Sequence, residues 1–204
     1  IVDVALADGA ETVVDRLAAP GRCGGEVREL ATARADDGVD IPYLRFAGRG
    51  PGDGPRPVVL EVYGAYGTSY DPDFDPARCA LLDRGVDLVI AWVRGGGELG
   101  EPWHDAARVH RRETATTDLI AVATRLVAAG QATPRALVVT GESAGGGLVA
   151  SALNARPELF SGAVLRVPFL DAVGTMADPG APLTTVEYEE WGDPRVRADY
   201  DVLR

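Results

Sequence analysis

The sequence predicts a three-layer α/β fold, in which helices cover both faces of a doubly wound, mostly parallel sheet. Two observations support this prediction. Apolar segments with strand character alternate with segments of helical periodicity along most of the 204 residues, and a glycine-rich strand–turn–helix pattern surrounds position 143. Alternating strands and helices require crossover connections, which set neighbouring strands parallel and place helices on the sheet faces. The length suits one domain with a substantial core.

The first predicted elements form an antiparallel hairpin that leads into the sheet. Residues 27–33 and 39–46 have strand character, and the turn-forming tripeptide Asp36-Asp37-Gly38 joins them. Beyond the hairpin, strands are expected at 58–63, 86–93, 136–139 and 162–167, and helices at 76–83, 117–129 and 145–155. The buried face of the helix at 117–129 is marked by Leu119, Val122, Ala123, Leu126 and Val127.

Composition and charge exclude several classes of protein. The net charge is −11, and because phosphate backbones are bound by clustered basic residues, no nucleic-acid partner is expected. No apolar run approaches the ~20 residues that a membrane span needs. The two cysteines, Cys23 and Cys79, are too few and too far apart for a disulfide framework. Both are expected to be free, which fits a cytoplasmic protein. No group of residues implies a metal or an organic cofactor.

The segment Gly141-Glu142-Ser143-Ala144-Gly145 indicates a serine nucleophile. A strand that ends in a sharp turn and continues at once as a helix projects the turn residue from the top of the sheet, and small neighbours are needed there. Ser143 is therefore the predicted nucleophile. The N–H group of Ala144, near the positive end of the helix dipole, would stabilise an oxyanion beside it. The alternative is a glycine-rich turn with an incidental serine.

A second glycine-rich segment, at residues 95–100, fits the dinucleotide-binding pattern G-x-G-x-x-G. Asp118 even lies about twenty residues further on, where a ribose-binding acid is expected. The context does not fit, however, because Glu101, Pro102 and Trp103 follow where a helix of small residues should begin. We therefore expect no dinucleotide site.

Four segments together resemble the prolyl oligopeptidase family of serine peptidases, and most closely its oligopeptidase B branch. The segments are 62–67 (VYGAYG), 94–100 (RGGGELG) with Trp103 behind it, 141–146 (GESAGG) and 182–192 (PLTTVEYEEWG). The resemblance implies an α/β-hydrolase fold that is incomplete at the C-terminus. Residues 27–204 would be the N-terminal part of the catalytic domain, and residues 1–26 a weakly patterned remnant from the end of a β-propeller.

The resemblance also implies a mechanism, the hydrolysis of peptide bonds through an acyl-enzyme. Ser143 matches the nucleophile of the family, and the N–H group of Ala144 matches one donor to the oxyanion. The hydroxyl of Tyr63 matches the second donor. Tyr66 is the alternative for that role, and a strand-end tyrosine without a catalytic part is the structural alternative for Tyr63.

Glu187 and Glu189 lie two positions apart, so on an extended segment both would face one pocket. Two carboxylates that share a pocket favour a bound cation, such as the guanidinium of a substrate Arg. In the oligopeptidase B branch, a matching acidic pair determines cleavage after Arg or Lys. The alternative is a solvated acidic face, because Glu190 extends the run to three.

The sequence departs from the family in its histidines. His104 and His110, the two that it contains, precede Ser143, whereas the family order places Asp and His after the nucleophile. We therefore expect a fragment of an oligopeptidase that acts on short peptides with basic residues and is inactive without the triad Asp and His. Two alternatives remain open: a non-catalytic truncated relative that binds basic peptides, and an esterase on the same fold.

Overall fold

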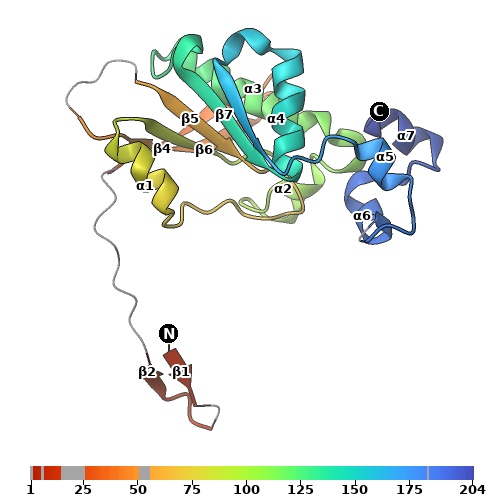
Figure 1. Ribbon diagram of the computed structural model, residues 1–204, viewed down its shortest axis with the longest axis horizontal. Coiled ribbons are helices and arrows are strands. Elements are labelled where there is room, and N and C mark those ends of the chain that lie inside the picture. The colour runs from red at the N-terminus through yellow and green to blue at the C-terminus, as the bar shows by residue number, and fades with distance from the viewer. Residues whose placement is uncertain (1, 6, 15–25, 51–55, 183) are drawn as a thin grey trace.

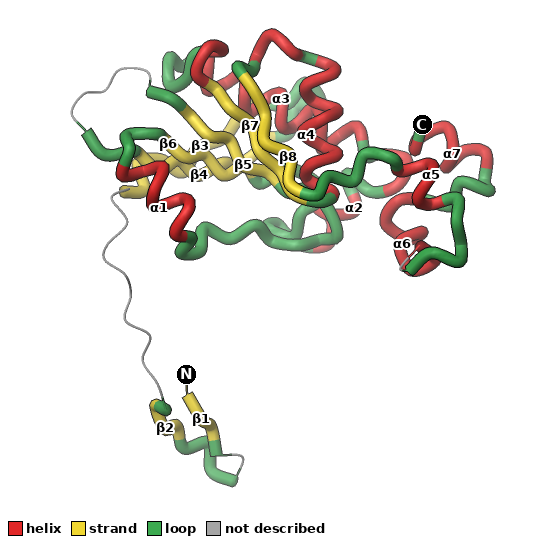
Figure 2. Tube along the Cα trace, viewed as in Figure 1, coloured by secondary structure: helices red, strands yellow, loops and turns green. Residues whose placement is uncertain are grey.

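The computed structural model describes residues 2–5, 7–14, 26–50, 56–182 and 184–204, and its main feature is a six-stranded sheet (Figures 1 and 2). The strands lie in the order β3-β4-β6-β5-β7-β8. Their bounds are Glu26–Arg34 (β3), Asp40–Ala47 (β4), Val58–Val62 (β5), Asp87–Ala91 (β6), Leu137–Glu142 (β7) and Gly162–Arg166 (β8). Within the sheet β4 alone runs against the other strands. The predicted hairpin and mostly parallel sheet are confirmed.

Three helices connect the parallel strands, namely α1 (Pro76–Asp83), α3 (Glu113–Ala128) and α4 (Ala144–Ala155). Figure 1 shows α3 and α4 together on one face of the sheet and α1 on the other. The start of α1 follows from its sequence, because the Asp75 carboxylate accepts a hydrogen bond of 2.6 Å from the N–H of Ala77 and a proline occupies the first helical position. The three predicted layers are thus present.

The main hydrophobic core lies between the sheet and the two helices α3 and α4. In β6, Val89 and Ala91 belong to this core, whereas Leu88 and Ile90 are equally buried but alternate toward the face that α1 covers. The predicted face of α3 is confirmed. Its fully buried residues are Leu119, Val122, Ala123 and Leu126, and Val127 packs against them.

Short helices gather beyond the carboxyl ends of the parallel strands (Figure 1). The 3₁₀ turns Pro134–Ala136 and Pro157–Leu159 lie at the other end of the sheet, where they lead into β7 and β8. The short helices are α2 (Glu101–Asp105), α5 (Ala172–Met176), α6 (Thr184–Trp191) and α7 (Arg197–Leu203), with a 3₁₀ turn at Val109–Arg111. A second hydrophobic cluster joins them to the sheet. It consists of Ala65, Ala144, Met176 and Trp191, with Tyr63 and Phe169 packed against it.

The N-terminal region contains a separate hairpin. Strands β1 (Val2–Val4) and β2 (Glu11–Val13) pair antiparallel and form a two-stranded sheet of their own. The assignment of residues 1–26 to the end of a β-propeller, and of residues 27–204 to a catalytic domain, stays a prediction.

One expectation about the cysteines is wrong. Cys79, on α1, is disulfide-bonded, so it is not the free thiol that the sequence suggested, and Cys23 lies outside the described residues. Cys79 therefore gives no support for a reducing compartment. In the described part of the chain, no helix has the length and apolar character that crossing a membrane requires.

Candidate active site

Ser143 occupies a strained turn between β7 and α4. Its backbone has φ 52° and ψ −118°, a left-handed φ that costs energy for a residue with a side chain. The turn is held on both sides, because Ser143 N–H donates to the carbonyl of Arg166 and Ser143 C=O accepts from the N–H of Phe169, both at 2.9 Å. The side chain of Ser143 is exposed. These features are those of a nucleophile on a strand-to-helix turn.

Glycines make this turn possible. A Cβ built on Gly141 would lie 2.3 Å from the carbonyl oxygen of Gly145, and one built on Gly146 would lie 2.7 Å from Cβ of Pro168. Neither position has room for a side chain, as the sequence pattern predicted.

Ala144 is the first residue of α4, where backbone N–H groups have no acceptor within the helix. Its N–H follows directly on Ser143 and lies at the positive end of the helix dipole. It can therefore donate to an oxyanion that forms on a carbonyl attacked by Ser143.

Tyr63 follows directly on β5, next to the elbow. A Cβ added to Gly145 would lie 2.7 Å from the carbonyl oxygen of Val62 and 3.0 Å from Cα of Tyr63, so this backbone touches the start of α4. The pKa of the Tyr63 hydroxyl is raised, first by burial and then by the charges of Glu187, Glu190 and Glu142. The hydroxyl consequently keeps its proton at neutral pH and can act as a donor.

The glycine-rich segment at 95–97 supports the loop that carries Tyr63. Gly67 N–H donates to the carbonyl of Gly95 at 3.0 Å, and Cβ atoms built on Gly95 and Gly97 would lie 2.3 and 2.0 Å from the carbonyl oxygens of Gly64 and Gly67. The two backbones are therefore in direct contact. Asp118 is engaged by Arg94, at 2.6 Å between Oδ1 and Nη2, which agrees with the rejection of a dinucleotide site.

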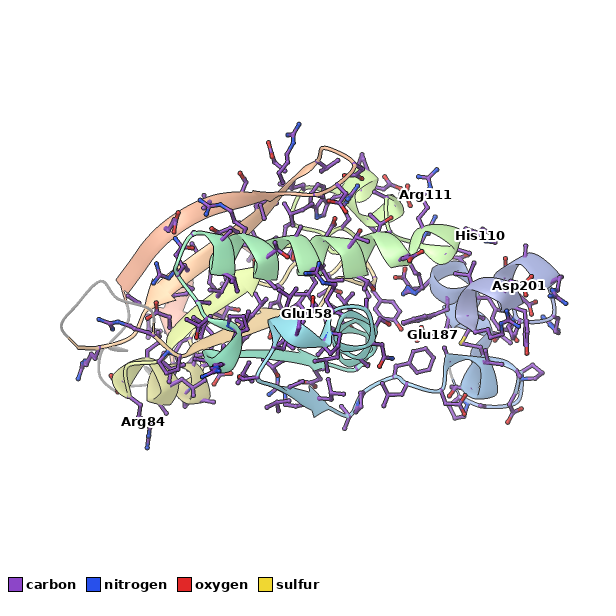
Figure 3. The ribbon with its side chains drawn as sticks, turned by 90° about the horizontal axis from the view of Figure 1, so that it is seen from above. Arg84, His110, Arg111, Glu158, Glu187 and Asp201 are labelled. Atoms are coloured by element: carbon purple, nitrogen blue, oxygen red, sulfur yellow. The ribbon has the colours of Figure 1, made fainter. Side chains whose placement is uncertain are left out.

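The acidic segment at residues 187–190 has a different conformation from the one that we predicted. The segment is a helix, so Glu187 and Glu189 do not face one pocket, because residues two apart point to different sides of a helix. Glu187 is half-buried and its Oε2 accepts a hydrogen bond of 2.6 Å from the Tyr66 hydroxyl, while Glu189 is exposed. Figure 3 shows Glu187 on the side of α6 that faces the body of the protein.

Glu190 is a buried residue of the site that the sequence did not single out. Its carboxylate contacts Nε2 of His104 at 2.7 Å, the N–H of Tyr66 at 3.0 Å and Nη2 of Arg112 at 3.3 Å. Helical spacing was the signal that could have found it, since position 190 lies one turn after position 187. From the sequence we expected an extended acidic segment, and Glu190 entered only in the alternative of a solvated acidic face.

Arg112 and Trp191 complete this cluster. The Arg112 guanidinium lies 3.3 Å from the centroid of the Trp191 ring, and Trp191 Nε1 donates to the Tyr66 hydroxyl at 2.7 Å. Burial lowers the pKa of Arg112 to about 10, so the side chain is still a cation at neutral pH. It offsets part of the negative charge of α6.

The remaining charged neighbours of the elbow are paired. Glu142 forms an exposed ion pair with Arg166 at 2.8 Å. His104 contacts Glu190, and His110, labelled in Figure 3, contacts Asp199 at 3.0 Å. Both histidines of the chain thus pair with carboxylates, and neither pairs with the nucleophile Ser143. Among the described residues, no group of His, Cys, Asp and Glu is arranged to hold a metal ion.

A cavity of about 840 Å³ lies beside the elbow, between α3, α4 and α7. Its lining includes Ala144, Leu148, Phe169 and Trp191, but not Ser143, Tyr63 or Glu187. Of the predicted site residues, Ala144 lines this cavity, whereas Ser143, Tyr63, Glu187 and Glu189 do not, and size alone does not make it the substrate site.

Comparisons with known proteins show the family of this chain. Residues 72–204 match the model of the prolyl oligopeptidase family. The chain is 43% identical over 178 residues to Protease 2 of Moraxella lacunata, an alignment that covers 87% of this chain and 26% of that protein. The chain therefore spans about a quarter of that relative's length.

Solved structures give the same result for the fold, which is that of an α/β-hydrolase. Oligopeptidase B from Leishmania major superposes with a TM-score of 0.86 and 40% identity, over 98% of this chain and 28% of that one. Oligopeptidase B from Trypanosoma brucei, with covalently bound antipain, gives 0.84 and 37%, over 98% and 29%. The chain belongs to the prolyl oligopeptidase family.

Proposed function

We propose that the protein to which this chain belongs is a serine peptidase that cleaves short peptides after Arg or Lys. The observation that carries the proposal is the contact of the strained Ser143 elbow with the loop of Tyr63, beside the carboxylate of Glu187. A nucleophile, two oxyanion donors and a receptor for a cation then belong to one site. Membership of the family supports the peptidase activity.

In the proposed mechanism, Ser143 Oγ attacks the carbonyl carbon of the scissile bond and gives its proton to a histidine base. The Ala144 N–H and the Tyr63 hydroxyl donate hydrogen bonds to the oxygen that becomes negative. Collapse of the tetrahedral intermediate expels the amine, which takes the proton, and leaves an acyl group on Ser143. A water molecule then attacks the acyl group through the same steps, and the carboxylic acid product is released from Ser143. Because His104 and His110 are paired elsewhere, the base and its Asp are expected later in the gene product, and this chain alone is expected to be inactive.

Glu187 is the proposed receptor for the basic side chain. Its carboxylate is half-buried beside Tyr66, and its charge acts on the Tyr63 hydroxyl, as the raised pKa of Tyr63 indicates. A guanidinium there would form charge-assisted hydrogen bonds close to the oxyanion donor. Glu189, on the exposed side of α6, is proposed to attract cationic substrates through its field alone.

A cytoplasmic site was expected on the ground that both cysteines are free, and the disulfide at Cys79 removes that ground.

Hydrolysis of chromogenic peptides by the full gene product tests the proposal. A peptide that ends in Arg is expected to be cleaved, the same peptide with a neutral residue in place of Arg much less, and Ser143→Ala is expected to abolish turnover of both. Ser151→Ala, in the helix behind the elbow, is the matched control and leaves the rate unchanged. Equal rates for the two peptides would contradict the basic preference, and an active Ser143→Ala variant would contradict the nucleophile.

A further inference from the structure

We infer that Glu190 is a positioning residue for the oxyanion donor Tyr63, acting by holding the backbone of Tyr66 in a left-handed conformation. This inference rests on the proposed function, because it concerns the loop that would stabilise the oxyanion. It adds a residue that neither the sequence pattern nor the proposed chemistry uses.

The loop from Tyr63 to Gly67 has a conformation that needs support. Tyr66 has φ 58°, which a residue with a side chain adopts at a cost, and Gly64 and Gly67 on either side have φ 65° and 59°. Such strain persists where surrounding contacts fix it. The Tyr66 N–H donates to Oε1 of Glu190 at 3.0 Å, so the contact acts on the strained residue itself.

Glu190 also holds the far end of the same loop through His104. The Nε2 atom of His104 lies 2.7 Å from Oε2 of Glu190. The His104 ring packs against Gly67 closely enough that a Cβ added there would lie 3.3 Å from it. One carboxylate therefore supports the loop at Tyr66 directly and at Gly67 through an imidazole.

The carboxylate is itself fixed by its surroundings. Glu190 has a relative exposure of 6%, and Arg112, which contacts it at 3.3 Å, is clamped on the ring of Trp191. Trp191 in turn packs edge-on against Phe169, whose N–H is bonded to Ser143. The chain of contacts thus runs from the nucleophile turn through α6 to the loop of the oxyanion donor.

This arrangement separates two roles on one helix. Glu187 contacts the Tyr66 side chain and is the proposed receptor for the substrate cation, whereas Glu190 is buried and contacts the Tyr66 backbone. Loss of Glu190 should therefore lower kcat for every substrate, while loss of Glu187 should affect basic substrates alone. That difference is what an experiment can measure.

The test compares variants of the full gene product in the background Arg112→Met, so that replacing Glu190 does not leave the buried cation of Arg112 without its carboxylate partner. In that background, Glu190→Met removes the acceptor but keeps the volume, and replacement of a buried ion pair by apolar residues of similar size is often neutral for stability. Glu190→Gln restores an amide oxygen that can accept from Tyr66 N–H. Glu158→Met, at an exposed residue of the 3₁₀ turn that leads into β8, is the matched control.

Glu190→Met is expected to lower kcat roughly 10- to 100-fold for both an Arg-ended peptide and a small neutral ester, with KM little changed, since a displaced donor costs about this much. Glu190→Gln should recover most of the loss. Because the effect acts through Tyr63, Glu190→Met should cost little more once Tyr63→Phe has removed the hydroxyl. A merely structural role would instead give losses that multiply in the two backgrounds.

Three results would overturn the inference: equal kcat values for Glu190→Met and Glu158→Met, multiplying losses with Tyr63→Phe, or no recovery with Glu190→Gln. If the wild-type protein cleaved neither substrate, the proposed function would fail instead. Hydrogen exchange of the Tyr66 amide still decides the positioning role in that case. Faster exchange in Glu190→Met than in Glu158→Met supports it, and equal exchange refutes it.

Discussion

The guanidinium of Arg94 and the carboxylate of Asp118 form two hydrogen bonds inside the protein, of 2.6 Å to Oδ1 and 2.9 Å to Oδ2. Asp118 is fully buried and also accepts from the Arg94 N–H at 3.0 Å. The other side of the guanidinium reaches Asp37, in the turn between β3 and β4. Arg94, which follows β6, therefore connects the β3–β4 hairpin to α3. It also begins the glycine-rich segment that contacts the Tyr63 loop.

Removal of one partner of this buried pair should be costly. Asp118→Ala is expected to lower the free energy of unfolding by about 3–5 kcal/mol, because it leaves the buried charge of Arg94 without its main partner. Urea unfolding measures the change. Asp40→Ala breaks the exposed pair of Arg34 and Asp40 and should cost less than about 1 kcal/mol. Similar losses in the two variants would contradict the importance given to the buried pair.

Gly97 offers a direct test of the contact between the two loops. Gly97→Ala would place a Cβ 2.0 Å from the carbonyl oxygen of Gly67, so one backbone has to move. Displacement of the Tyr63 loop is expected to lower kcat for peptide cleavage roughly 100-fold, since misplacement by about 1 Å has effects of this size. Gly162→Ala, where a Cβ meets nothing within 4 Å, is the control and should leave kcat unchanged. A fully active Gly97→Ala variant would show that the loops are not coupled.

Much of the fold was predictable because its signals are local. The central strands are short apolar runs, and α1 begins at an Asp-Pro pair that caps it. The elbow was also predictable, since a serine between glycines after a buried strand has few structural explanations. For these elements, local preference and tertiary packing agree.

The conformation of α6 was not predictable in the same way. The first residues of α6 are Thr184, Thr185 and Val186, which are β-branched and favour strands. The segment as a whole has no apolar stripe at helical spacing. Tertiary contacts decide the outcome, because Trp191 packs on Phe169 and Glu190 is buried against Arg112 and His104. The expectation that Glu187 and Glu189 face one pocket was wrong because this one element is a helix and not an extended segment. The disulfide at Cys79 was missed because two distant cysteines carry no pairing signal.

Tyr63 is expected to contribute to catalysis through its hydroxyl. In the full gene product, Tyr63→Phe should lower kcat about 10²- to 10³-fold with little change in KM, as removal of one oxyanion donor does. Tyr43→Phe is the matched control, because Tyr43 is a buried residue of β4 whose hydroxyl donates to Oε1 of Gln131 at the long distance of 3.5 Å. Steady-state kinetics on an Arg-ended peptide measure both. An effect on KM alone would assign Tyr63 to substrate binding, contrary to our proposal.

Glu187 and Glu189 should have unequal effects on substrate preference. Glu187→Gln is expected to lower kcat/KM for an Arg-ended peptide roughly 10- to 100-fold, because a hydrogen bond to a charged group is worth about 1.5–3 kcal/mol, and to leave a neutral ester unaffected. Glu189→Gln should have a small effect that disappears at high salt, as expected for an exposed charge. Equal, salt-resistant losses in the two variants would restore the model of a shared pocket.

Glu98 should make stability depend on pH. Its Oε1 accepts from Tyr70 N–H at 2.9 Å, whereas its Oε2 is buried and, within the described ranges, has no hydrogen-bond partner. Burial raises the pKa of this carboxyl above its ordinary value of 4.5, so the folded protein holds the proton more tightly than the unfolded chain. The contribution of Glu98 to stability is therefore largest below pH 4.5 and falls as the pH rises through the folded pKa. Glu98→Gln cannot lose a proton and should raise the melting temperature at neutral pH but not at acidic pH. Glu11→Gln, at an exposed residue, should change neither value, and a Glu98→Gln curve parallel to wild type at all pH values would refute the burial of a charge at this position.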